Sequence, residues 1–234
     1  MDKRLEEIRE SERKSHIEMY SNEELYNSES WLKKPIKTVR DLIPLFDDYE
    51  KLDVLDLGCG VGRNCLAIAQ EYQNIDCSID CVDILEIAIE KLSKYAAEHG
   101  VLHCINGIVK PIEDYKIEKE SYDLIIGVSS LEHIDTKDSF ISKLTEIGNG
   151  TRKDGIVCFV INSQVKEFDK SSGVEIPAQF EVNLSTEEMQ SILNKIFDGW
   201  TVLKSTVQRQ QYDIPRENII SDLRTNVVTF VARK

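Results

Sequence analysis

The stretch Val54-Leu-Asp-Leu-Gly-Cys-Gly-Val-Gly-Arg-Asn64 decides the fold. A short apolar strand ends near Asp56, and glycines at positions 58, 60 and 62 follow it before a helix is expected. Glycine lets a backbone turn sharply and approach a ligand where a Cβ atom would collide. The start of the helix adds unpaired N–H groups and a partial positive charge. The stretch therefore predicts a ligand-binding turn between a strand and a helix.

Strands and helices alternate on both sides of this turn. Apolar runs predict seven strands, at residues 54–57, 78–82, 103–109, 122–128, 155–161, 201–208 and 227–232. Helices are expected at 62–72, 85–99, 137–147 and 185–197, the last opened by a capping box of Ser185 and Glu188. Such alternation predicts an α/β fold with a seven-stranded, mostly parallel, Rossmann-like sheet and helices on both faces. Ligands of such sheets bind beyond the carboxyl ends of the strands.

Residues 1–31 are polar and charge-rich, and we interpret them as an N-terminal helical cap. Residues 32–234 then form one compact domain. A helix is expected from Trp31 to Ile43, with Pro35 in its first turn and Pro44 ending it.

Charge and composition narrow the possible partners. The chain carries 29 Lys and Arg against 42 Asp and Glu, a net charge of −13. This charge repels phosphate backbones and anionic lipid, so neither a nucleic acid nor a membrane is an expected partner. We find no targeting or membrane-spanning segment, and the six cysteines form no CxxC pair. We therefore expect a cytoplasmic protein with reduced thiols and no metal.

A nicotinamide dehydrogenase would use a GxGxxG turn to hold a pyrophosphate. Counted from Gly58, the last glycine of this pattern would fall at Arg63. Counted from Gly60, it would fall at Cys65, so neither register fits. Asp56 would also lie unfavourably close to a pyrophosphate, whereas it suits a ligand with an ammonium group.

Asp83 ends the second expected strand, about 20 residues after the glycine turn, where a carboxylate can accept hydrogen bonds from ribose hydroxyls. DLGCGVG followed by Asp83 resembles the S-adenosylmethionine (SAM) signature of class I methyltransferases. The resemblance implies SAM as cofactor and S-adenosylhomocysteine as product. It implies cofactor contacts from Trp31, Asp56, Gly58, Cys59, Gly60, Arg63, Asp83, Ile84, Ile112, Glu113, Val128 and Ser129. The family's acidic residue after the third strand is replaced by Pro111, so either Glu113 or Asp114 could contact the adenine.

Residues 122–134 resemble the family's fourth strand and the loop that follows it. His133 would face the acceptor there, either as a general base or as a residue that orders the loop. Some relatives hold a metal with Glu-x-x-Glu-His, but Ser129 occupies the first Glu position, so no metal is expected. The motifs of nucleobase methyltransferases are absent.

The chain also resembles the tellurite-resistance methyltransferases, at residues 31–35, 62–64, 180–200 and 229–234. It lacks that family's His-Arg pair before the last strand, and Arg63, Arg216 and Arg224 are candidate cations near the acceptor. The cap and residues 164–180 would form the acceptor pocket. We therefore expect methyl transfer to a small molecule, with a tellurite-like species and a thiol as the candidate acceptors, and little turnover of tellurite itself. The alternative is a SAM-binding regulatory or scaffold protein, and the chain would be a monomer or homodimer.

Overall fold

The computed structural model describes residues 3–22, 25–27, 32–216 and 219–234. Within these residues one eight-stranded sheet has the order β3-β2-β1-β4-β5-β8-β7, and β6 pairs with β5. The strands are β1 (Lys51–Leu57), β2 (Asp76–Asp83), β3 (Ile105–Val109), β4 (Tyr122–Val128), β5 (Thr151–Asp169), β6 (Glu175–Ile176), β7 (Thr201–Pro215) and β8 (Ile220–Arg233). The helices are α1 (Lys3–Asn22), α2 (Lys37–Leu42), α3 (Cys65–Glu71), α4 (Glu86–Glu98), α5 (Lys137–Gly150) and α6 (Thr186–Ile196).

The expected mostly parallel α/β sheet is confirmed, with one strand more than the seven predicted. Strands β1 to β5 pair in parallel, while β8 runs antiparallel to both β5 and β7. The strand order reverses at β1, which has β2 on one side and β4 on the other. The glycine turn follows β1 and therefore lies where ligands of such sheets bind.

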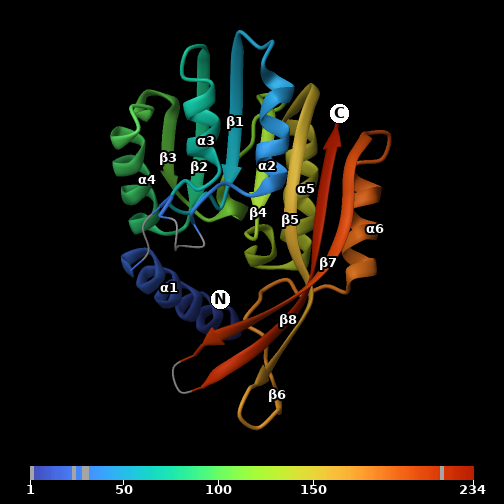
Figure 1. Cartoon of the computed structure of the whole chain (residues 1–234). Coiled ribbons are helices and arrows are strands. Elements are labelled where there is room, and N and C mark those ends of the chain that lie inside the picture. Colours follow the sequence, from blue (N-terminus) through green and yellow to red (C-terminus); the bar gives the residue numbers. More distant parts are fainter. Residues whose placement is uncertain (1–2, 23–24, 28–31, 217–218) are drawn as a thin grey trace.

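The core consists of two apolar layers on opposite faces of the sheet. Val54 and Leu55 are adjacent on β1 and fully buried, yet they belong to different layers. Leu92 of α4 packs in the first layer and Leu144 of α5 in the second. Successive side chains of a strand point to opposite faces, so a strand buried on both sides reads as a continuous apolar run. Helices therefore cover both faces, as predicted (Figure 1).

The helix expected from Trp31 is shorter than predicted. Trp31 lies outside the described residues, and α2 begins only at Lys37, with Ile36 extended at its N-terminus (φ −63°, ψ 148°). Pro35 disfavours the helical region for the residue before it, so a helix that continues from residue 34 through Pro35 is unfavourable. The α-helix ends at Leu42, next to the predicted end at Ile43, and Pro44 lies in the first turn of a 3₁₀ helix, Ile43–Phe46, where its missing N–H costs nothing.

Three strands extend well beyond their predicted ends. Residues 163–169 of β5, 209–215 of β7 and 220–226 of β8 pair with one another past the domain sheet. Figure 1 shows them projecting below the sheet beside α1, and we call these three segments the arm. The register of β5 against β8 shifts between Ser163 and Lys166, where the arm leaves the domain. No helix of the described chain has the length and apolar character needed to span a membrane.

Candidate functional site

The glycine turn is fastened to the end of the neighbouring strand. Gly58 and Cys59 both donate their backbone N–H groups to the carbonyl of Val82, at 2.8 and 3.0 Å. Gly58 has φ +74°, and a Cβ atom there would lie 2.2 Å from the Cβ of Ser130. Only glycine fits both this backbone conformation and this contact.

Asp83 holds the other side of the turn. One carboxylate oxygen accepts a hydrogen bond from the N–H of Gly60 and the other from the N–H of Leu85, both at 2.9 Å. The residue is 8% exposed, and burial raises its pKa despite these two bonds. Asp83 thus fixes the turn while staying at the end of β2, next to the end of β1.

Asp56 is almost completely buried. It is 1% exposed, and no described residue donates a hydrogen bond to its Oδ2 atom. Burial first, and the charge of Asp83 second, raise the pKa of Asp56 to about 7. A buried polar atom without a partner is costly unless a ligand satisfies it. The pair Asp56 and Asp83 therefore offers acceptor atoms to a ligand that carries donors.

Helix α1 lies against this turn. The hydroxyl of Tyr20 is 2.8 Å from the position that a Cβ atom on Gly60 would take, and Tyr20 is only 6% exposed. Lys91 of α4 donates a hydrogen bond to the Tyr20 carbonyl. Burial, with a smaller contribution from Asp83, raises the pKa of Tyr20 far above its usual value, so the hydroxyl remains a donor. No sequence pattern indicates this contact, which joins residues 40 positions apart.

Several other expected cofactor residues border the same region. Ile84 follows Asp83 and is 49% exposed, a large apolar side chain facing solvent. Val128 ends β4 half-buried, and Ser129 is exposed with φ +51°. The Ser129 N–H donates to the carbonyl of Val160 at 2.7 Å. Cys59 is buried within the turn itself.

The remaining residues expected to contact the cofactor are bonded to other residues or are partly buried. Glu113 forms an ion pair with Arg9 of α1, whereas Asp114 is exposed. Ile112 is half-buried against the apolar layer that contains Leu55. Arg63 donates from Nε to the carbonyl of Lys34 at 2.9 Å.

His133 has a carboxylate partner that sequence reasoning missed. Its Nδ1 atom lies 2.8 Å from Oε2 of Glu181, a side chain only 2% exposed, and its ring stacks on Phe180 at 5.1 Å. Arg9 approaches the other oxygen of Glu181 at 3.8 Å. The sequence separation of His133 from Glu181 hid this pair. A carboxylate on Nδ1 orients the ring and leaves Nε2 as the atom that can accept a proton.

Glu132 anchors the loop that carries His133. It is fully buried, and its Oε1 accepts hydrogen bonds from the backbone N–H of Asn162 at 3.0 Å and the side-chain amide at 2.6 Å. Burial raises the pKa of Glu132. In the part of the chain that the structure describes, no cluster of three or more His, Cys, Asp or Glu could hold a metal ion.

The part of the chain that carries the glycine turn and both strand-end carboxylates is similar to methyltransferase domains. Residues 54–155, from β1 to the start of β5, match the family model described as a methyltransferase domain, which covers less than half of the chain. Among curated proteins, the ubiquinone biosynthesis O-methyltransferase of Rickettsia canadensis is 34% identical over 101 residues. That match covers 43% of this chain and 40% of the relative, so the chain spans well under half of the relative's length.

Solved structures extend the likeness to most of the fold. TehB from Haemophilus influenzae aligns with 83% of this chain and 62% of its own, with a TM-score of 0.59 and 19% identity. A SAM-dependent methyltransferase from Methanosarcina mazei aligns with 82% of this chain and 97% of its own, with a TM-score of 0.57 and 15% identity. At these identities the structures show the fold. Together with the domain match, they show that the chain shares the fold of the methyltransferases it resembles.

Proposed function

We propose that this protein transfers the methyl group of SAM to a small-molecule acceptor. The observation that carries the proposal is the arrangement at the ends of β1 and β2. Asp56 has a buried oxygen with no donor among the described residues, Asp83 lies beside it, and the glycine turn leaves no room for side chains. These features fit a ligand with an ammonium group and two ribose hydroxyls.

The cofactor contacts follow from this arrangement. Asp56 would accept from the ammonium group, the backbone at Gly58 and Gly60 would meet the methionine end, and Asp83 would accept from the ribose. The exposed side chain of Ile84 would pack on the adenine. Asp114 is the better candidate for the adenine amino group, because Glu113 is already paired with Arg9. Bound SAM supplies a methyl group activated by its sulfonium.

His133 is our candidate for the base that removes a proton from the acceptor. The 2.8 Å contact between Nδ1 and Glu181 and the stacking of the ring on Phe180 support this role over a merely structural one. Arg9 of α1 contacts both Glu113 and Glu181, so the helix that covers the glycine turn also borders the acceptor side. Closing this end against water and aligning the acceptor would be the main catalytic contributions of the chain.

The three candidate arginines favour a neutral or cationic acceptor over tellurite. Arg216 binds Glu167 through two nitrogens, at 2.7 and 3.0 Å. Arg224 pairs with Asp222 at 2.7 Å, and Arg63 bonds to the carbonyl of Lys34. Each of these three cations thus already has a partner, so a small oxyanion that reached only one of them on the acceptor side would gain little. A small organic acceptor, such as a phenol, an amine or a thiol, remains the best proposal.

Calorimetry with SAM, S-adenosylhomocysteine and NAD tests the proposal first. We expect both adenosyl ligands to bind, NAD not to bind, and Asp56→Ala and Asp83→Ala to weaken SAM binding. Release of S-adenosylhomocysteine should then be measured with phenols, amines, thiols, selenite and tellurite. Unchanged SAM affinity in both variants would contradict the site. Binding without turnover of any acceptor would favour the regulatory alternative, and saturable turnover of tellurite would refute our acceptor class.

Glu181→Gln tests the assignment of the base. If His133 removes a proton, we expect kcat to fall for phenol or amine acceptors while SAM affinity stays unchanged. An acceptor that is already a thiolate should be methylated at nearly the wild-type rate, which provides the internal control. Equal loss for both kinds of acceptor would assign His133 a structural role instead.

A further inference from the structure

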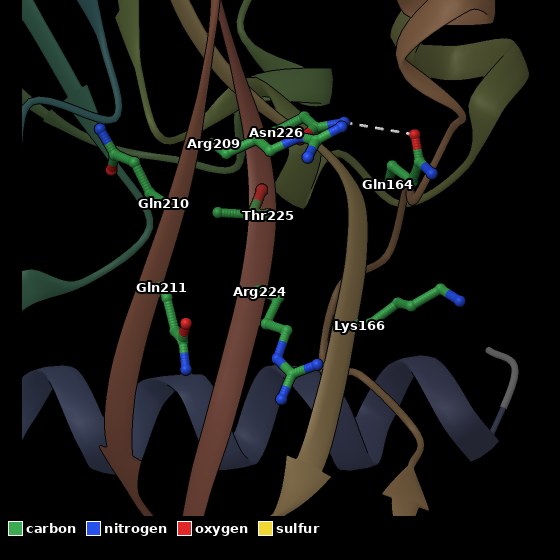
Figure 2. Close-up of a pocket in the computed structure, with 8 residues that line it drawn as sticks. All are labelled: Gln164, Lys166, Arg209, Gln210, Gln211, Arg224, Thr225 and Asn226. Atoms are coloured by element: carbon green, nitrogen blue, oxygen red, sulfur yellow. Dashed lines mark hydrogen bonds between the residues drawn. The ribbon is translucent and has the colours of Figure 1, made fainter.

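An open cavity lies on the arm, away from the glycine turn. Its volume is about 370 Å³, within the range typical of small-molecule sites, and strands β5, β7 and β8 form its floor (Figure 2). Its described lining contains no Asp or Glu, although the chain has 42 of them. It contains three cations, Lys166, Arg209 and Arg224, together with the amide side chains of Gln164, Gln211 and Asn226.

The strand register places these side chains in two rows on one face of the arm. Arg224 of β8 lies directly opposite Lys166 of β5 on one side and Gln211 of β7 on the other. Two residues further along β8, Asn226 lies opposite Arg209. Residues i and i+2 of a strand share a face, so both rows point the same way. Figure 2 shows the two rows one above the other.

This arrangement is electrostatically unfavourable for the protein alone. Lys166 and Arg224 are like charges directly opposite each other, which destabilises a pair of strands. Arg224 is compensated by Asp222, at 2.7 and 2.9 Å, and by the ring of Phe168 at 4.5 Å. Lys166 and Arg209 make no side-chain hydrogen bond or ion pair with any residue that the structure describes. A chain with a net charge of −13 thus keeps Lys166 and Arg209, which have no ion-pair partner among the described residues, on the same face of the arm as Arg224.

Backbone strain at the rim of the cavity is a second, independent observation. Gln164 has φ +50°, a conformation that non-glycine residues rarely adopt, at the irregularity where β5 enters the arm. Its N–H donates to the carbonyl of Leu184 at 2.7 Å, and its Oε1 accepts from the amide of Asn226 at 3.3 Å. Strain of this kind gathers at functional sites.

We propose that this cavity binds a small polyanion of the diphosphate type. Arginine presents a planar fork to phosphate oxygens and lysine a point charge, while amide N–H groups complete the donors. Neighbouring strands are about 4.8 Å apart and alternate residues of one strand about 7 Å apart, which places three cations within reach of two linked phosphates. A single carboxylate could not engage both rows.

The site is separate from the methyl-transfer site of the proposed function. Glu167, the neighbour of Lys166, is 1% exposed and bonds to Arg216 and Ser221 on the other face of the arm. Arg216 reaches Gln179, which in turn accepts from Ser11 of α1. Figure 2 shows α1 behind the strands, with the side chains of the two rows in front of it. Polyanion binding and SAM binding can therefore be measured independently.

The test is calorimetric titration of the full chain with pyrophosphate and, in parallel, with ADP. We expect one site per chain, and affinity weakened by roughly tenfold or more in the double variant Lys166→Gln, Arg209→Gln, because two charged donors are lost. Arg40→Gln, Lys195→Gln is the matched control, since it removes the same two charges from exposed positions elsewhere. Tighter binding of ADP than of pyrophosphate would identify a nucleotide as the source of the diphosphate.

Three results would overturn the proposal. One is the absence of a binding isotherm for both pyrophosphate and ADP with the wild-type chain. A second is equal weakening in the control variant, which would mean that only net charge matters. The third is binding of single-stranded RNA through Lys166 and Arg209 without binding of pyrophosphate. Unchanged SAM affinity of the double variant shows that it is folded, and none of these results bears on the proposed methyl transfer.

Discussion

The glycine turn and the arm cavity are built in opposite ways. At the glycine turn, Asp56 and Asp83 are buried, close together and acidic, and Gly58 packs against Ser130 without space for a methyl group. On the arm, Lys166 and Arg209 are exposed cations held only by the register of paired strands. Burial and close packing control the first region, so single substitutions there should have large effects. Repulsion between solvent-exposed charges controls the second region. Substitutions there should therefore change stability only slightly, and the change should depend on salt concentration.

Gly58→Ala should produce the largest effect. The φ of +74° costs a non-glycine residue about 1–2 kcal/mol, and forcing a methyl group against Ser130 adds about 1–3 kcal/mol. We therefore expect the free energy of unfolding to fall by about 2–5 kcal/mol in urea denaturation.

Gly100→Ala is the control, because Gly100 has the same φ of +74° and no atom within 4 Å of the added Cβ. Its loss should be limited to the backbone contribution, about 1–2 kcal/mol. Adding Ser130→Gly to Gly58→Ala should recover part of the difference. Equal losses at Gly58 and Gly100 would mean that close packing does not control the turn.

Asp56→Asn should stabilise the fold at neutral pH while removing SAM binding. In the folded protein the pKa of Asp56 is raised to about 7 from an ordinary value of 3.8, so the wild type loses stability as the pH rises between these values. The asparagine variant avoids that loss. We expect it to be more stable than the wild type by about 2–4 kcal/mol above pH 7, and nearly equal to it at pH 4.

Thermal unfolding across this pH range measures the effect. Asp83→Asn is the contrasting variant, because both Asp83 oxygens accept backbone N–H groups and an amide can replace only one of them. It should be less stable than the wild type at pH 7. A stability difference at Asp56 that does not change with pH would mean that burial of its charge is not the cause.

Asp83→Ala should weaken SAM binding by about 1–3 kcal/mol, because hydrogen bonds between the ribose and a charged acceptor are lost. Asp76→Ala is the control, since Asp76 begins the same strand at its opposite end and is exposed. Calorimetry at one pH and salt concentration compares the two variants. Equal weakening by both would show that Asp83 acts only through net charge.

The sequence predicted the strands around the glycine turn well and the strands of the arm poorly, for a physical reason. Strands β1 and β4 are continuous apolar runs, because helices cover both their faces. Strand β7 is exposed along nearly its whole length, so it carries no apolar alternation that could mark its end at Pro215. Its pairing with β8 depends on backbone hydrogen bonds that any residue can form.

Long-range contacts on the acceptor side were also not predictable from the sequence. His133 could be singled out from the loop that carries it, but its partner Glu181 lies in an irregular segment that only the folded chain brings within 2.8 Å. The contact of Tyr20 with the glycine turn is likewise set by the docking of α1. Local patterns report burial and turns, whereas pairings between distant polar residues leave no periodic trace.

Lys166→Gln should produce the smallest effect, and its sign is informative. The substitution removes a like-charge pair directly opposite Arg224 and breaks no side-chain hydrogen bond or ion pair with a described residue. We expect the free energy of unfolding to rise by about 0.2–1 kcal/mol at low salt. The gain should vanish near 1 M salt, where the Debye length is about 3 Å. Lys195→Gln, on the exposed side of α6, should show no such gain. A loss of stability in Lys166→Gln would mean that the lysine stem stabilises the arm by packing, and the two rows would then not be a strained arrangement that favours an anion.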